Sequence, residues 1–391
     1  MASPKDLICN TSTTAQKVAI KNVRVFHGEQ LTAPTSVVIE GGIIVSDGTG
    51  AQEIDGANGV LIPGLIDSHV HLEDERHLQR MADWGVTTAL GMGEWRPEKL
   101  HALRNREGLT DIRSACIPAT TPGSLHSKLL PIPRVAFVSG PGDASRYVRD
   151  RLAEGADYIK VIADLPGPDQ PTLNALVSAA HEQGKLVITH AATYIPFTMA
   201  LAAKSDVITH VPRDKVLDDE SVARMMTDEL VSVPTLTMME TLCKHPGWSA
   251  IMRLLLQPSL LWTVIKSRRW FIGAESYEHC KESVMRLYRA GVPVLVGTDS
   301  NEEEDSPFQI RHGEALHHEL ELLVDAGMST VNALRAATSV PAKRFGLSDR
   351  GVIEPGKRAD LVLLRNDPIN DIRATRSIQR VWCGGIEHTR D

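Results

Sequence analysis

Residues 61–72 read Leu-Ile-Pro-Gly-Leu-Ile-Asp-Ser-His-Val-His-Leu, and this stretch decides the fold. It is an apolar run that ends in two histidines two positions apart, His69 and His71. Side chains along a strand repeat with period two, so a buried strand here places both imidazoles on one face. Two neutral imidazoles on one rigid strand end form half of a transition-metal site. The remaining ligands of such a site must come from elsewhere in the chain.

Further apolar segments of strand length follow this one. Most are separated by stretches of helical period, such as residues 143–154, 172–183 and 219–228. Repeated strand–helix units predict parallel strands with right-handed crossovers. Eight units close into a (β/α)8 TIM barrel, whose catalytic groups lie at the C-terminal strand ends. The expected strands cover residues 64–71, 86–92, 112–119, 158–163, 186–191, 207–211, 231–236 and 294–299.

Both ends of the chain are rich in β-branched residues and glycine turns. Neither end has enough short strands to bury a sheet face alone, so we expect the two ends to pair into one small β-sandwich domain. This assigns residues 1–62 and 352–391 to the sandwich and residues 63–351 to the barrel. A helix over residues 330–345 is expected to lead back to the sandwich.

Composition bounds the class of protein. Hydrophobic residues make up 42% and charged residues 23% of the 391 positions, which predicts a folded globular chain. The net charge of -7 and the lack of long basic clusters argue against nucleic acid as a partner. No leader or membrane span is expected. Five scattered cysteines favour the reducing cytoplasm over a disulfide framework, and a homo-oligomer is left open.

Four further polar residues close or interrupt apolar strands: Lys160, His190, His210 and Asp299. Each has an ordinary explanation by itself, since a lone strand histidine is more often a hydrogen-bonded core residue than a ligand. Asp299 can equally cap a helix. A buried lysine is rarer, because desolvating an ammonium is costly. All of them fall in the layer of the predicted barrel where chemistry occurs, which favours one shared site.

Several motifs resemble the amidohydrolase superfamily, in its binuclear subtype with a carboxylated lysine. The similarity is greatest to the branch around imidazolonepropionase-related hydrolases, Xaa-Pro dipeptidases and ochratoxinase, and it covers nearly the whole chain. The motifs are Pro-Gly-Leu-Ile-Asp-Ser-His-Val-His at 63–71, Gly-Val-Thr-Thr at 85–88, Gly-Ala-Asp-Tyr-Ile-Lys-Val at 155–161, Gly-Thr-Asp at 297–299, and the segments 319–328 and 351–363.

The resemblance implies two divalent metal ions, zinc being favoured over manganese, cobalt or iron. It implies that His69, His71 and Asp299 hold the more buried ion and that His190 and His210 hold the more exposed one. Lys160, carboxylated at N6, would lie between the ions. An unmodified lysine is a cation at neutral pH and would repel metals, whereas a carbamate offers two anionic oxygens.

The implied reaction on a small-molecule substrate is hydrolysis of an amide C–N bond other than an ordinary peptide bond, as in an N-acyl amino acid or a cyclic amide. A metal-bridging hydroxide attacks, and Asp299 is the catalytic proton carrier. Hydrolysis of a lactone, another ester or a phosphoester on the same site is the alternative. A mononuclear deaminase and a non-catalytic scaffold are two other hypotheses.

The sequence departs from its relatives at two places. Many of them follow Gly-Val-Thr-Thr with Arg-Asp, but residues 89–92 read Ala-Leu-Gly-Met, so the pocket wall is altered. Tyr194 is displaced from the position that holds a substrate carboxylate in dipeptidase relatives, which counts against a dipeptidase. Substrate-binding residues are therefore left unassigned.

The remaining candidates are given structural roles. His126 lies in a long proline-containing loop from which it could reach the site, but we expect it to be exposed. We expect the acidic run 302–305 to be a solvated loop or the start of a helix. Tyr194 and Arg213 are as consistent with a surface role as with substrate contact. The segment 240–290 predicts either packing or an apolar cover over a substrate. Its aromatic residues are Trp248, Trp262, Trp270 and Phe271.

Overall fold

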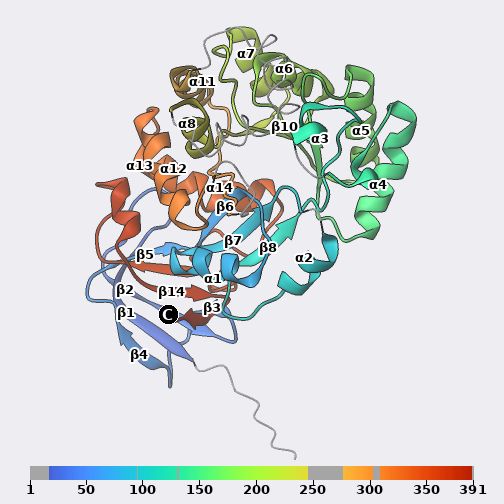
Figure 1. Cartoon of the computed structure of the whole chain (residues 1–391). Coiled ribbons are helices and arrows are strands. Elements are labelled where there is room, and N and C mark those ends of the chain that lie inside the picture. Colours follow the sequence, from blue (N-terminus) through green and yellow to red (C-terminus); the bar gives the residue numbers. More distant parts are fainter. Residues whose placement is uncertain (1–16, 95, 130–131, 245–275, 303–308, 390–391) are drawn as a thin grey trace, which may run out of the picture.

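The computed structural model describes residues 17–94, 96–129, 132–244, 276–302 and 309–389. Figure 1 shows a barrel flanked by helices, with a curved sheet from the two chain ends lying against one end of it. This is the predicted fold class, a (β/α)8 barrel with a β-sandwich built from both termini. None of the helices among the described residues is long and apolar enough to cross a membrane.

The barrel strands form two parallel sheets. Between them, Ala119 N–H donates to the Lys160 carbonyl at 2.8 Å and Ile162 N–H donates to the Ala119 carbonyl at 2.9 Å, so main-chain bonds continue around the barrel. Almost every strand residue is buried, as expected for strands covered on both faces. The strands are β6 (Leu65–Val70), β7 (Val86–Gly91), β8 (Asp111–Ser114), β9 (Ile159–Ile162), β10 (Val187–His190), β11 (Val207–Thr209) and β12 (Val231–Val233).

The eighth segment, residues 294–299, closes the barrel without forming the predicted regular strand. It makes isolated bridges, from Val294 to Ser232 of β12 and from the adjoining Ser300 to Val70 of β6. Single main-chain bonds also join it to β6, such as Asp299 N–H to the His69 carbonyl at 2.8 Å. The prediction is wrong because a side chain replaces part of the main-chain ladder. The buried Asp67 carboxylate accepts the Thr298 N–H at 3.1 Å and the Thr298 hydroxyl at 2.7 Å.

Helices flank the barrel on the outside (Figure 1). Those predicted at 143–154, 172–183 and 219–228 are confirmed as α4, α5 and α7. Side chains of Asp74, Asp169, Asp218, Ser276 and Ser329 accept first-turn N–H groups and fix where α1, α5, α7, α11 and α13 begin. The helices are α1 (Glu75–Asp83), α2 (Pro97–Leu103), α3 (Leu125–Leu129), α4 (Ala144–Ala153), α5 (Gln170–Glu182), α6 (Tyr194–Ala203), α7 (Asp219–Thr227), α8 (Leu236–Lys244), α11 (Tyr277–Ala290), α12 (Glu314–Asp325), α13 (Thr330–Ala336) and α14 (Ser339–Arg344).

The single helix predicted over residues 330–345 is wrong, because α13 and α14 are separate. The carbonyls of Ala336 and Ala337 accept hydrogen bonds from the barrel, from Val296 N–H at 2.9 Å and from Ile66 N–H at 2.7 Å. Pro341 has no N–H to continue the helical ladder. The break therefore ties these helices to the end of the barrel opposite the strand C-termini.

The small sheet joins the two ends of the chain. Its order is β15-β14-β13-β5-β1-β2-β3, with β4 also pairing with β1. The antiparallel pair of β5 with β13 links the N-terminal strands to the C-terminal ones, with Pro63 opposite Leu361. Domain boundaries at 62/63 and 351/352 remain a prediction. The strands are β1 (Val18–Val25), β2 (Thr35–Glu40), β3 (Ile43–Val45), β4 (Gln52–Asp55), β5 (Val60–Pro63), β13 (Leu361–Leu364), β14 (Ile378–Cys383) and β15 (Ile386–His388).

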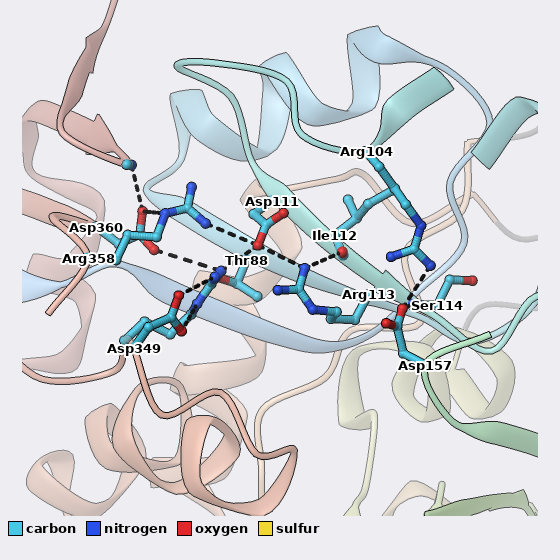
Figure 2. Close-up of polar contacts among 12 residues, drawn as sticks. Thr88, Arg104, Asp111, Ile112, Arg113, Ser114, Asp157, Asp349, Arg358 and Asp360 are labelled. Atoms are coloured by element: carbon cyan, nitrogen blue, oxygen red, sulfur yellow. Dashed lines mark hydrogen bonds and ion pairs between the residues drawn. The ribbon is translucent and has the colours of Figure 1, made fainter. Parts of the chain in front are cut away.

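A buried charge network holds the C-terminal segment to the start of β8. Figure 2 shows the Arg358 side chain between Asp111 and Asp360, with Nη1 3.0 Å from Asp111 Oδ2 and Nε 3.3 Å from Asp360 Oδ1. Arg350, which is 3% exposed, donates to Asp111 Oδ2 at 2.7 Å. Burial alone would raise the pKa of Asp111, but Arg350, Arg113 and Arg358 outweigh it and hold the pKa low. The carboxylate is thus kept ionised.

Candidate metal centre

Four predicted histidines converge at the C-terminal ends of the barrel strands. His69 lies in β6 and His71 one residue past it, His190 ends β10, and His210 directly follows β11. The ring centroids of His69 and His71 are 5.5 Å apart, those of His69 and His210 5.1 Å, and those of His190 and His210 4.4 Å. The imidazoles therefore form one continuous group.

Asp299 lies within this group. Its Oδ1 is 3.0 Å from His71 Nε2 and 3.3 Å from His69 Nε2, and its Oδ2 is 4.0 Å from His210 Nδ1. Burial raises the pKa of Asp299, but the neighbouring imidazoles, His69 first, outweigh burial and hold it well below its usual range. Asp299 and His210 both adopt left-handed backbone angles, with φ of 59° and 71°. Such strain in non-glycine residues concentrates at functional sites.

Lys160 projects from β9 and is 3% exposed. Its Nζ donates to Thr209 Oγ1 at 2.7 Å, and no carboxylate among the described residues forms an ion pair with it. Burial lowers its pKa to about 7, with Asp299 opposing the shift. A large fraction of this amine is therefore neutral at physiological pH, and the neutral amine is the form that combines with carbon dioxide.

The protonation states of three of the four imidazoles suit metal ligands. Burial lowers the pKa of His69 to about 3, and it holds the pKa values of His190 and His210 well below their usual range. Neutral imidazole is the metal-binding form. His71 differs, because its bond to Asp299 outweighs burial and raises its pKa to about 9. Its Nδ1 donates to the Gly93 carbonyl at 3.0 Å, which leaves Nε2 directed at Asp299.

The donor set fits a pair of cations. His69, His210 and Asp299 offer ligand atoms within 4.8 Å of one another. So do His126, Asp164 and His190, but His126 Nδ1 and Asp164 Oδ2 are already hydrogen-bonded to each other, which leaves His190 as the free donor of that group. Buried Nδ1 of His69 has no hydrogen-bond partner in the described part of the chain. Imidazole nitrogens with carboxylate oxygens suit zinc and similar divalent ions. Which imidazole serves which ion remains a prediction.

His126 is not exposed as expected; the alternative, that it reaches the site, is the one the structure shows. His126 lies in α3, its side chain is 23% exposed, and its Nδ1 is 2.5 Å from Asp164 Oδ2. Its ring packs edge-on against His190 with centroids 4.6 Å apart. The sequence did contain a signal for Asp164. Positions 160, 162 and 164 are two residues apart, so an extended chain places Asp164 on the same face as Lys160. The His126–Asp164 pair therefore adds a second polar group beside the histidines.

Glu94 is another buried residue that sequence reasoning missed. It follows β7, is 5% exposed, and accepts a hydrogen bond from the Ser114 hydroxyl. Burial raises its pKa to about 7, although Ser114 and His71 act in the opposite direction. A Cβ on Gly91 would lie 2.3 Å from Glu94 Oε1. The altered wall at residues 89–92 thus includes a glycine that makes room for this carboxyl group.

The structure does not give the weaker substrate-binding candidates a place in the site. The Tyr194 hydroxyl donates to Asp218, and Lys215 Nζ lies 3.6 Å from the centre of its ring. These bonds give Tyr194 a local packing role. Trp248, Trp262, Trp270 and Phe271 lie outside the described residues.

Comparison with known proteins adds family context to this geometry. A model of the amidohydrolase family matches residues 60–386. An adenine deaminase of Methylobacterium nodulans is 24% identical over 379 residues, covering 90% of this chain and 54% of that protein. An imidazolonepropionase of Deinococcus deserti is 35% identical over 103 residues, which cover 26% of this chain and 25% of that protein. The chain thus spans about half the length of the adenine deaminases it matches.

Solved structures show the same fold. A Xaa-Pro dipeptidase with methionine bound in its active site superposes with a TM-score of 0.78 at 23% identity, covering 96% of this chain and all of that one. Ochratoxinase from A. niger superposes with a TM-score of 0.73 at 19% identity, covering 95% of each chain. At these identities the likeness is one of fold.

Proposed function

Since the chain belongs to the amidohydrolase family, we propose that it is a metal-dependent hydrolase of an amide C–N bond other than an ordinary peptide bond. The observation that carries this proposal is the buried Lys160. An ammonium beside four imidazoles would repel cations, yet burial brings its pKa to about 7 and no ion pair in the described residues compensates its charge. Carboxylation at N6 turns this cation into an anionic ligand.

We assign the ligands as follows. His69, His71 and Asp299 would hold one ion, His190 and His210 would hold the other, and carboxylated Lys160 would supply an anionic ligand to both. The short contacts of Asp299 with His69 and His71 support the first group. The ring contact of His190 with His210 supports the second. Nitrogen and oxygen donors favour zinc in both positions.

Divalent ions bound there would acidify a water molecule and polarise the substrate carbonyl. Asp299 is the proton carrier, because its low pKa keeps the carboxylate free to accept the proton of the attacking water. It then passes that proton to the departing nitrogen. This transfer is needed because an amide anion is too basic to leave unprotonated.

We assign His126, whose ring packs against His190, the role of stabilising the substrate oxygen. Asp164 accepts a hydrogen bond from its Nδ1–H, so Nε2 can donate only when the ring is doubly protonated, and the Asp164 carboxylate favours that cationic form. Burial lowers the pKa of His126, but Asp164 outweighs it and raises the pKa overall. A positioned donor of this kind stabilises an oxyanion more strongly in a water-poor site than in solution.

The substrate class is an N-acyl amino acid or a cyclic amide. Two other reactions fit the same side chains, ester or phosphoester hydrolysis and deamination. The similarity to adenine deaminases favours deamination as the second candidate, because that reaction also replaces a C–N bond by hydrolysis.

Matched substrates separate these reactions. The zinc-loaded protein should hydrolyse N-acyl amino acids or cyclic amides, lose this activity with a chelator, and regain it when zinc is restored. The corresponding esters test the ester alternative, and ammonia release from aminopurines tests deamination. Turnover of esters or aminopurines alone would replace the amide assignment.

A further inference from the structure

A cluster of polar side chains adjoins His71, and we call it the His312 cluster: His77, Arg80, Glu302 and His312. His312 is 1% exposed, and its Nε2 lies 2.8 Å from the His71 carbonyl oxygen. Its Nδ1 lies 2.9 Å from Glu302 Oε2, which also accepts the His312 N–H at 3.1 Å. The His77 ring stacks on His312 with centroids 4.0 Å apart. The imidazole of His312 is thus fixed in position and orientation.

The prediction that the acidic run 302–305 is solvated is wrong for Glu302. The Glu302 side chain is only 16% exposed, and Arg80 Nη1 donates to its Oε1 at 2.6 Å. The rest of that run lies outside the described residues. Glu302 therefore links α1, through Arg80, to His312.

His71 is held from several directions at once. Its N–H donates to the Ser300 carbonyl at 2.9 Å, its Nδ1 donates to the Gly93 carbonyl at 3.0 Å, and its Nε2 lies 3.0 Å from Asp299. Its own carbonyl accepts from His312. We call the line of hydrogen bonds between β6 and the segment that carries Asp299 the seam. The main-chain bonds of the seam end at His71 N–H, and the contact of His312 with the His71 carbonyl comes next.

We propose that His312 is a positioning residue for the metal centre, which holds the His71 main chain against the segment bearing Asp299. The proposal rests on the proposed function, because it presumes that His71 and Asp299 bind an ion together. Main-chain bonds join the eighth segment to β6 as far as His71, with Asp299 N–H donating to the His69 carbonyl at 2.8 Å and His71 N–H to the Ser300 carbonyl at 2.9 Å. The His312 side chain adds the next hydrogen bond beyond them and so helps to fix how far apart His71 and Asp299 lie.

The same cluster could be read as a further metal site, since His77, Glu302 and His312 offer ligand atoms within 4.8 Å of one another. Its atoms are already engaged, however. Both ring nitrogens of His312 are hydrogen-bonded, and His77 Nδ1 accepts the Glu73 N–H at 3.1 Å. Glu302 Oε1 binds Arg80. Metal binding would break several of these bonds, so positioning is the better account.

The chain offers a matched control in His317. This imidazole is fully buried in α12, with Nε2 3.0 Å from the Trp84 carbonyl and Nδ1 2.9 Å from Thr375 Oγ1. It is built like His312 but touches neither His71 nor Asp299. Replacing it perturbs a comparable buried imidazole away from the proposed ligands.

The experiment compares zinc affinity in the full chain, by competition with a chelator, for the wild type and for His312→Ala, Glu302→Ala and His317→Ala. We expect His312→Ala to weaken the binding of one of the two zinc ions, the one assigned to His71 and Asp299, about 10- to 100-fold, as loss of a group that orients a ligand does. Glu302→Ala should weaken it in the same direction, and His317→Ala should leave it unchanged. Glu302 is partly exposed, so this variant decides the question if His312→Ala does not fold.

Four other outcomes would overturn the proposal, and each has a different meaning. Wild-type zinc affinity in both His312→Ala and Glu302→Ala refutes positioning while leaving the proposed function intact. An equal loss in His317→Ala reduces the effect to general destabilisation. A third zinc ion in the wild type that disappears in His77→Ala makes the cluster a metal site. Absence of zinc binding by the wild type removes the proposed function and this inference together.

Discussion

His71 Nε2 lies 3.0 Å from Asp299 Oδ1, although the two residues are 228 positions apart in the chain. One follows the first barrel strand and the other lies in the segment that closes the barrel. The contact therefore forms only when the barrel is complete. Assembly of the candidate metal centre thus depends on closure of the barrel.

Replacing Asp299 by asparagine tests its role in proton transfer. Asparagine keeps the shape and one oxygen but cannot take up a proton from water. We expect kcat to fall by about 10²- to 10⁴-fold, while most of the metal stays bound. Steady-state kinetics beside metal analysis checks this, and near-normal turnover would refute the role.

Replacing His126 by alanine removes the proposed donor to the substrate oxygen. We expect kcat to fall by about 10²- to 10³-fold. Metal content should not change, because His126 is not among the assigned ligands. Asp164→Asn keeps the imidazole but weakens its orientation, so its effect should be smaller and in the same direction. If His126→Ala instead loses one ion per chain, His126 is a ligand rather than a donor.

Replacing Glu94 by glutamine should change how stability depends on pH. Burial raises the pKa of Glu94 from 4.5 to about 7, so the folded state binds this proton more tightly than the unfolded state. That contribution is full below about pH 4.5 and is lost as the pH rises through about 7. Glutamine does not ionise. When the pH is raised from about 5 to about 8, the unfolding free energy of the metal-free wild type should therefore fall by about 1–3 kcal/mol relative to that of the variant.

Urea denaturation of both proteins at the two pH values measures this difference. Glutamine can still accept the hydrogen bond of the Ser114 hydroxyl, so the comparison isolates the charge. A stability difference that stays constant with pH would show that Glu94 does not titrate in this range.

Replacing Asp111 by asparagine should destabilise the fold. It removes the closest carboxylate of the buried Arg350 and an ion-pair partner of Arg358. Arg350 keeps two bonds to Asp349, so we expect a loss of about 1.5–3 kcal/mol in unfolding free energy, which is typical of a lost hydrogen bond to a charged group. Asp371→Asn is the control, since its pair with Arg373 is exposed on both sides. If Asp111→Asn lowers the unfolding free energy as little as Asp371→Asn does, solvent screens the charges of this network.

The candidate ligands could be predicted because each one stands at or near the end of an apolar strand. His190 and His210 illustrate this, since strand period and barrel topology together bring them into one layer. Glu94 and His126 could not be found in this way. They lie in connections beyond the strands, where no periodicity relates sequence position to direction.

The eighth barrel segment shows a second limit. Its residues are apolar and β-branched like a strand, yet Asp67 replaces part of its main-chain pairing. Which side chain will substitute for a ladder bond depends on contacts between residues more than 200 positions apart. The break between α13 and α14 has the same origin, because two of its carbonyls bond to the barrel instead of to the helix.

The most direct test is the metal content of the purified chain, measured together with the mass of the peptide that contains Lys160 under conditions that preserve carbamates. We predict two divalent ions per chain and a mass increase of one carbon dioxide on Lys160, with both ions lost in Lys160→Ala. A wild-type chain that binds no divalent ion when zinc is supplied, or that binds two around an unmodified Lys160, would contradict the account.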